Sequence, residues 1–170
     1  MNAVAEREET QDQIGKSDAF VVEADGDRLG RSLFVICDEI SVKISGSDTG
    51  GAFAVMENRT MPMGGPPLHL HHEQDEWWYI LEGRYRFVVD GREFEAGPGA
   101  TVFAPKGSRH AFQNIGSTPG RTLVTVVPAG LDEFFEEMDA AVPRGTVPAI
   151  GVVVPLFEKY GMELLGSPLG

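Results

Sequence analysis

All four histidines of the chain fall within two short segments. His69, His71 and His72 lie together in the first segment, and His110 stands alone in the second. Imidazole is the commonest protein ligand for transition metals such as zinc, iron, copper and nickel. A chain that gathers its whole histidine supply in two segments is therefore predicted to build one metal site.

The spacing indicates which side chains share that site. Side chains alternate between the two faces of a strand, so His69 and His71 point the same way and His72 points the other way. Glu76 can return as a carboxylate ligand at the start of the next strand, beyond a turn. His110 is the remaining histidine. Three imidazoles and one carboxylate leave one or two coordination positions open, as catalytic metal sites do.

The composition indicates one acidic globular domain. The chain has 170 residues, of which 42% are hydrophobic and 24% charged, and a formal net charge of -12 at pH 7. This charge argues against nucleic acid or an anionic membrane as a partner. No run resembles a signal peptide or could cross a bilayer, so a cytoplasmic location is expected. Cys37 is the single cysteine, which excludes an internal disulfide, and its apolar neighbours favour a buried small residue.

Short runs of β-branched and aromatic residues, separated by Gly, Asp and Ser, predict an all-β sandwich or barrel. Strands are expected over residues 20–22, 32–36, 40–44, 52–59, 77–81, 85–89, 92–95, 101–104, around His110 and over 121–127. A loop is expected over residues 45–51. The pair Asp90-Gly91 predicts a tight hairpin, because a type I′ turn needs positive φ at both central residues.

The C-terminal part changes from strand to helix periodicity. Apolar residues recur at helical spacing at Leu131, Phe134, Phe135, Met138 and Ala141. This pattern predicts an amphipathic helix that covers an end or edge of the β-structure and stops at Pro143. A short second helix is expected from about Pro155, which suits a first-turn position, to Gly161.

Two motifs in the chain resemble those of the cupins. The first consists of Gly64, His69, His71, Glu76 and Gly83, and the second of Gly99, Pro105, Gly107, His110 and Asn114. Four residues separate Gly64 from His69, where the family form more often has five. The resemblance extends over about residues 50–128. Residues 160–169 also resemble the tail of small bacterial cupins often labelled quercetin-dioxygenase-like.

The resemblance implies a single-domain jelly-roll β-barrel with C-terminal helices. The expected parts are a flexible N-terminal arm over residues 1–17, the barrel over 18–128, and a helical extension over 129–170. The resemblance also implies one metal ion inside a mouth of the barrel, held by His69, His71, Glu76 and His110.

The family spacing also assigns the neighbours of the ligands. It selects Glu76 over Glu73 and Asp75, which are then solvated loop residues. His72 is expected at the surface or behind the ligands. Asn114 is expected to close a turn or to satisfy backbone groups.

The residues beside the ligands predict the character of the pocket. Trp78 and Ile80 share strand parity with Glu76, and Phe112 shares it with His110, so they are expected to line the cavity. Met56, with Met61 and Met63, is a further candidate for the same wall, and ordinary core packing is the alternative for each of these residues. A mostly apolar pocket with one polar metal corner suits an aromatic or lipophilic substrate.

The resemblance implies an enzyme that uses one divalent transition metal: Fe, Mn, Ni, Co, Cu or Zn, with iron favoured. The first hypothesis is a dioxygenase that acts with O2 on an enolic or phenolic, flavonol-like molecule. The comparison with quercetinases implies that Glu76 accepts the substrate proton.

Two other hypotheses remain open. The second is an O2-independent isomerase, lyase or cyclase, and the third is a cupin that binds a small ligand without turnover. No helix-turn-helix segment or basic face points to a nucleic-acid-binding regulator. Small cupins commonly form dimers, so a homodimer is expected, with the strand around Phe20 as the candidate to cover an exposed sheet edge.

Overall fold

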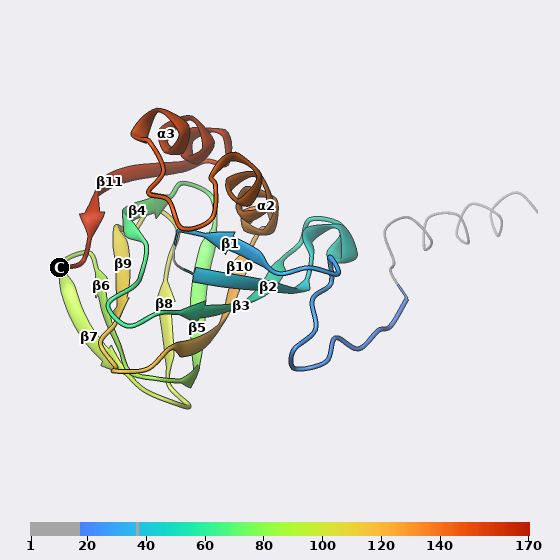
Figure 1. Ribbon diagram of the computed structural model, residues 1–170, viewed down its shortest axis with the longest axis horizontal. Coiled ribbons are helices and arrows are strands. Elements are labelled where there is room, and N and C mark those ends of the chain that lie inside the picture. The colour runs from blue at the N-terminus through green and yellow to red at the C-terminus, as the bar shows by residue number, and fades with distance from the viewer. Residues whose placement is uncertain (1–17, 37) are drawn as a thin grey trace, which may run out of the picture.

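The computed structural model describes residues 18–36 and 38–170, which form two antiparallel sheets and two C-terminal helices (Figure 1). The strands are β1 (Leu33–Val35), β2 (Asp38–Ile44), β3 (Ala54–Thr60), β4 (Pro67–His71), β5 (Asp75–Glu82), β6 (Tyr85–Val89), β7 (Arg92–Ala96), β8 (Thr101–Ala104), β9 (His110–Asn114), β10 (Gly120–Val127) and β11 (Met162–Pro168). The helical segments are the 3-10 helix η1 (Gly46–Thr49) and the α-helices α2 (Leu131–Ala141) and α3 (Ile150–Lys159).

The two sheets divide the strands between them in an order that brings distant segments together. The six-stranded sheet has the order β1-β2-β3-β10-β5-β8, and the five-stranded sheet has the order β11-β4-β9-β6-β7. Alternate residues of the central strands are buried, as strands with one covered face require. On β3 these residues are Ala54, Met56, Asn58 and Thr60. The predicted all-β class is confirmed, and strands follow most of the expected runs.

Aromatic rings from the two sheets meet in the core. Trp78 of β5 belongs to the six-stranded sheet, and its ring centroid lies 5.3 Å from that of Phe87 on β6 of the other sheet. Phe87 in turn lies 5.5 Å from Phe112 on β9. All three side chains are almost fully buried. Tilted rings at such separations contribute beyond simple area burial, so this cluster helps to hold the sheets together.

The hairpin between β6 and β7 has the predicted geometry. Asp90 and Gly91 both have positive φ, 48° and 76°, and Val89 pairs with Arg92 across the turn. Positive φ at both central residues matches the right-handed twist of the flanking strands, which explains why Asp-Gly occurs here.

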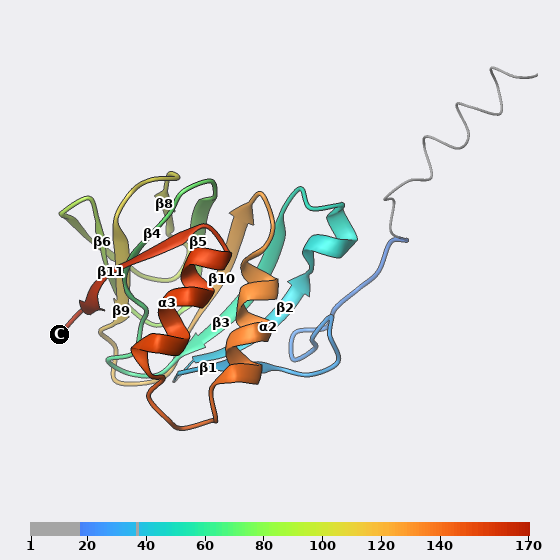
Figure 2. The same ribbon diagram turned by 90° about the horizontal axis from the view of Figure 1, so that it is seen from above.

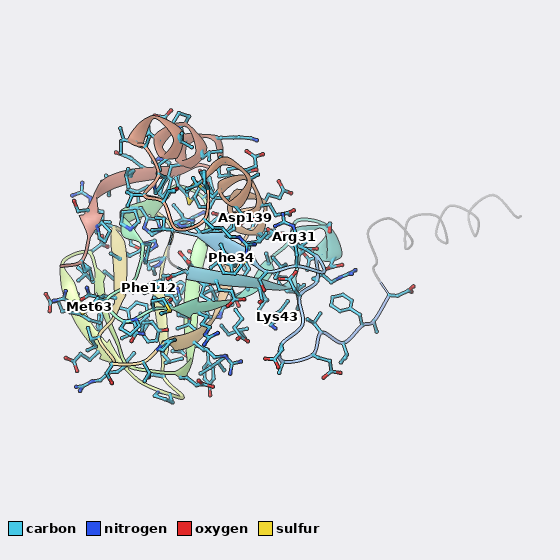
Figure 3. The ribbon with its side chains drawn as sticks, viewed as in Figure 1. Arg31, Phe34, Lys43, Met63, Phe112 and Asp139 are labelled. Atoms are coloured by element: carbon cyan, nitrogen blue, oxygen red, sulfur yellow. The ribbon has the colours of Figure 1, made fainter. Side chains whose placement is uncertain are left out.

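Both helices lie along the same side of the molecule (Figure 2). Helix α2 packs on β1 and β3, and α3 packs on β11 and on α2. Helix α2 has the predicted bounds. Its Asp139 ties it to the six-stranded sheet, because the carboxylate accepts hydrogen bonds from Arg31 Nη1 at 2.6 Å and from the backbone N–H of Phe34 at 2.9 Å (Figure 3).

Four expectations about the elements are wrong. Residues 20–22 form no strand; the guanidinium carbon of Arg28 instead lies 4.6 Å from the centroid of the Phe20 ring. The loop expected over residues 45–51 contains η1, whose first turn is capped by the Ser45 hydroxyl. Helix α3 begins at Ile150, and Pro155 lies inside it. The region predicted to be helical also ends in strand β11, which pairs with β4.

Some expectations lie outside what the structure describes. The arm over residues 1–17 and the buried position of Cys37 fall outside the described residues. The homodimer and the domain boundaries stay predictions. Among the residues that are described, no helix is both long enough and apolar enough to traverse a lipid bilayer.

Gly65 lies where the chain enters β4, and its position tolerates no side chain. A Cβ on Gly65 would overlap the carbonyl oxygen of Phe112, and the residue has a φ of 153°. Because the neighbour is backbone and cannot rotate away, Gly65→Ala is expected to lower the free energy of unfolding by about 3 kcal/mol in urea denaturation. Gly99→Ala is the control: it has positive φ but open space, so a loss of about 1 kcal/mol is expected. If both variants lose the same free energy of unfolding, the positive φ accounts for the loss at Gly65 and the steric clash with Phe112 does not.

Candidate metal centre

The four predicted ligands converge between the two sheets. His69 and His71 lie on β4 and His110 on β9 of the five-stranded sheet, where His69 pairs directly with His110. Glu76 comes from β5 of the six-stranded sheet. One candidate ligand atom from each residue lies within 4.8 Å of the others, and all four side chains are buried. The cluster therefore joins the two sheets at one point.

The second ring nitrogen of each histidine is held by an oxygen acceptor. The Nδ1 atoms lie 2.8 Å from the Pro67 carbonyl oxygen for His69, 2.7 Å from Gln74 Oε1 for His71, and 3.0 Å from the Ser108 carbonyl oxygen for His110. An oxygen acceptor at Nδ1 requires the proton there, which leaves the lone pair on Nε2. Such hydrogen bonds orient histidines that bind metals.

Gln74 is the positioning residue that sequence reasoning missed. It was expected to be part of a turn, but its side chain is buried and holds His71. Its own amide orientation is fixed because Nε2 donates to the carbonyl oxygens of Pro128 and Ala129, at 3.1 and 3.0 Å. In the sequence, Gln74 stands out only as the uncharged residue between Glu73 and Asp75. That position does not reveal that its amide binds the backbone at Pro128 and Ala129.

Removing the Gln74 amide is expected to weaken metal binding without removing a ligand. Gln74→Leu leaves the Nδ1–H of His71 without its acceptor, so affinity for a divalent metal should fall about 10- to 100-fold in competition with a chelator. Glu73→Gln, next to it and exposed, is the control and should leave the affinity unchanged. Unchanged affinity in Gln74→Leu would exclude this orienting role.

The spacing of the inward-facing atoms fits a bound cation. Glu76 Oε2 lies 3.1 Å from His110 Nε2 and 3.3 Å from His71 Nε2. Two ligands at right angles with bonds of about 2.1 Å would be about 3.0 Å apart. Among the described residues, the buried His71 Nε2 has no hydrogen-bond partner, although Glu76 Oε2 lies 3.3 Å away. An orphaned nitrogen of this kind is what a metal ligand looks like without its ion.

The histidine pKa values show how the cluster balances charge. Burial, and then the nearby His110 and His71, hold the pKa of His69 well below its usual value. Burial also lowers the pKa of His71, against the opposing charge of Glu76. Burial alone would lower the pKa of His110 too, but its hydrogen bond to Glu76 and the charge of that carboxylate raise it overall. Burial thus disfavours the charged form of His69 and His71, while Glu76 favours protonation of His110, so metal binding at this cluster is expected to compete with protons.

A largely apolar cavity adjoins the ligands, between the strands and the two helices. Its lining includes His69, His71 and Glu76 together with Trp78 and Phe112, two of the four predicted pocket residues. The other two, Met56 and Ile80, are fully buried but do not line this cavity. Strand alternation correctly predicted that both side chains face the interior. It does not predict whether an interior side chain reaches the cavity or packs in the core beside it.

The helices supply the remaining wall, which the sequence did not predict. Phe134 of α2 and Phe157 of α3 line the cavity, with their ring centroids 5.2 Å apart. The Phe157 ring also stands edge-on to His69 at 5.9 Å. Apolar rings therefore cover the ligand cluster, which lowers the local dielectric and strengthens electrostatic interactions inside it.

The other polar residues of the two motifs lie away from the cavity. His72 is exposed and faces Glu163, with 3.8 Å between Nε2 and Oε2. Asp75 accepts a hydrogen bond from the backbone of Lys106 at 2.9 Å. Asn114 is fully buried, and its amide donates to the carbonyl oxygens of Thr60 and Thr118, which confirms its structural role.

Similar proteins support the fold and the matched segment. A family model described as a cupin domain matches residues 59–126, which contain all four residues of the buried cluster. An uncharacterized protein of Methanocaldococcus jannaschii is 36% identical over 40% of this chain and 55% of its own length. Tetracenomycin polyketide synthase protein TcmJ of Streptomyces glaucescens is 30% identical over 35% of this chain and 40% of its own length. The chain thus spans about half the length of these curated relatives.

A solved structure extends the similarity beyond the matched segment. The polyketide cyclase RemF of Streptomyces resistomycificus is 28% identical, with a TM-score of 0.53 over 65% of this chain and 80% of its own. The two-sheet fold, the match over residues 59–126 and this structural likeness agree with one another. Residues 59–126 therefore match a cupin domain, and the two-sheet fold of the chain is consistent with that of a small cupin.

Proposed function

We propose that this protein is a metal-dependent enzyme that acts on an enolic or phenolic aromatic molecule. The observation that carries the proposal is the buried cluster of His69, His71, Glu76 and His110 at one end of a mainly apolar cavity. The proposed ion is one of Fe, Mn, Ni, Co, Cu or Zn, since imidazole and carboxylate ligands suit all of these. In this proposal the two sheets form the jelly-roll barrel expected of a cupin.

The substrate class follows from the lining of the cavity. Trp78, Phe112, Phe134 and Phe157 present ring surfaces, which favour a planar apolar body. The cluster provides a polar corner where an enolate or phenolate oxygen would be stabilised. When bound, the metal would act as a Lewis acid toward that oxygen.

An O2-independent reaction such as cyclisation is the first candidate. It is favoured by the similarity to the RemF and TcmJ proteins, whose names place them in polyketide chemistry. Ring closure of such a molecule requires removal of a proton beside a carbonyl group. Glu76 is suited to hold that proton, because its carboxylate is buried and faces the cavity. The aromatic cover from α2 and α3 would keep water away from the enolate.

A dioxygenase is the second candidate. The four residues would hold the metal from one side, and the cavity beside the cluster would provide space for a substrate and O2. In this reaction Glu76 would again accept the proton of the substrate hydroxyl. The alternative of ligand binding without turnover would use the same pocket.

Turnover with and without O2 tests the proposal. The protein, reconstituted with each candidate ion, is incubated with flavonols and with linear and partly cyclised aromatic polyketides, and the products are identified by mass spectrometry. A product of unchanged mass, or one that has lost only water, under strict anaerobiosis would establish the first candidate. Incorporation of both atoms of labelled O2 would establish the second. Tight metal binding with no product from any of these substrates would contradict an enzymatic role.

A further inference from the structure

A second polar region lies in the same cavity, away from the metal centre. Asp38 at the start of β2 and Asn58 on β3 both line the cavity, and both are more than nine-tenths buried. Asp38 Oδ2 accepts a hydrogen bond from Thr60 Oγ1 at 3.1 Å. These groups come from the six-stranded sheet, close to the partly exposed Ile36, which also lines the cavity.

Apart from His71 Nε2 in the metal cluster, two buried atoms of lining residues have no hydrogen-bond partner within the described part of the chain. One is Asn58 Oδ1, an acceptor on a side chain that is 6% exposed, and the other is Trp78 Nε1, a donor on a side chain that is 1% exposed. Burying a polar atom without a partner is costly, so such atoms are rare in native proteins. An unpartnered acceptor and an unpartnered donor on two side chains that line the same cavity point to a ligand that supplies their partners.

The strand register places these groups at successive depths. Glu76 pairs with Val126 of β10, whereas Asn58 pairs with Thr122 of the same strand. Thr122 and Val126 are four residues apart on β10, so Asn58 and Glu76 lie about 13 Å apart along the strand direction. Trp78 lies between them. A ligand that spans from the metal centre to Asn58 must therefore be elongated.

We propose that the cavity binds an elongated aromatic ligand with oxygen at both ends: a metal-binding oxygen at the cluster and a hydroxyl group at Asn58. This inference rests on the proposed function and specifies its substrate. Asn58 Oδ1 accepts the hydrogen bond of the distal hydroxyl, next to the carboxylate of Asp38. The indole N–H of Trp78 donates to an oxygen in the middle of the ligand. Flavonols hydroxylated on their far ring and linear polycyclic phenols have this pattern.

Binding of three flavonols to the zinc-loaded protein tests the distal hydroxyl. Zinc is redox-inactive, so binding is measured without turnover. 3,4′-Dihydroxyflavone is expected to bind roughly three- to tenfold more tightly than 3-hydroxyflavone, the gain typical of one hydrogen bond. 3-Hydroxy-4′-methoxyflavone, which has an acceptor but no donor at that position, should bind no better than the parent compound.

A matched pair of variants assigns the preference to Asn58. Asn58→Leu keeps the shape of the side chain but removes the acceptor, so the preference should disappear, while the melting temperature stays the same or rises. Thr122→Val is the control: Thr122 pairs with Asn58, and its Oγ1 is also buried without a partner among the described residues, but Thr122 does not line the cavity. This variant should keep the full preference.

The possible results separate this inference from the proposed function. Equal affinity of the wild-type protein for all three flavonols, or a preference that survives Asn58→Leu, would overturn the inference alone. Flavonol binding that is absent, or that is unaffected by removal of zinc, would overturn the proposed function as well.

Discussion

Replacing His110 by alanine is expected to lower the affinity for divalent metal by more than about 100-fold, beyond the loss usual for residues that only orient a ligand. His110 is the candidate ligand on β9, and its Nε2 lies 3.1 Å from Glu76 Oε2. Its loss leaves three donors and an uncompensated buried carboxylate. Competition with a chromophoric chelator, using each candidate ion, measures the effect.

His72→Ala is the matched control for this experiment. His72 is adjacent to a ligand in the sequence but exposed, so its removal should leave most of the affinity intact. Full metal retention in His110→Ala would overturn the ligand assignment. Equal losses in the two variants would point to binding at the surface instead of the buried cluster.

Glu76→Gln should reduce turnover by about 100- to 10,000-fold, the range for loss of a general base. The amide keeps the size of the side chain and one oxygen that can bind a metal, but it cannot accept a proton at neutral pH. The rate is measured on samples whose metal content has been determined, so that weaker metal loading is not mistaken for slower chemistry.

The control for Glu76→Gln is Glu73→Gln, which removes the same charge from an exposed position three residues earlier. This variant should retain wild-type activity. If fully metal-loaded Glu76→Gln retains a rate within a few-fold of wild type, the carboxylate acts only as a ligand and another group must move the proton.

The sequence placed His69 and His71 together by a local rule, whereas Glu76 and His110 were assigned to the same cluster by the spacing of the cupin-like motifs. His69 and His71 are two residues apart on one strand, and strand parity alone directs them to the same side. The hairpin at Asp90-Gly91 and helix α2 were predicted for the same reason, since turn chemistry and helical spacing are local.

The unpredicted features depend on partners far along the chain. Gln74 acts through backbone carbonyls more than fifty residues away, and Asn58 is informative only because its surroundings leave one atom without a partner. Strand β11 was missed because its residues alternate poorly and include Gly166 and Pro168, so pairing with β4 decides their conformation. The start of α3 was misplaced because proline was given its preferred first-turn position, whereas here it lies in the helix interior.

The pairing of β11 with β4 has a consequence for the integrity of the protein. Met162 lies opposite His71 and Leu164 opposite His69, so the final strand covers the outer edge of the strand that carries two ligands. Cleavage after Gly161 would expose the N–H and C=O groups of that edge, which could then pair with another molecule. Proteolytic trimming at this end would thus promote self-association and disturb the strand that carries His69 and His71 in one event.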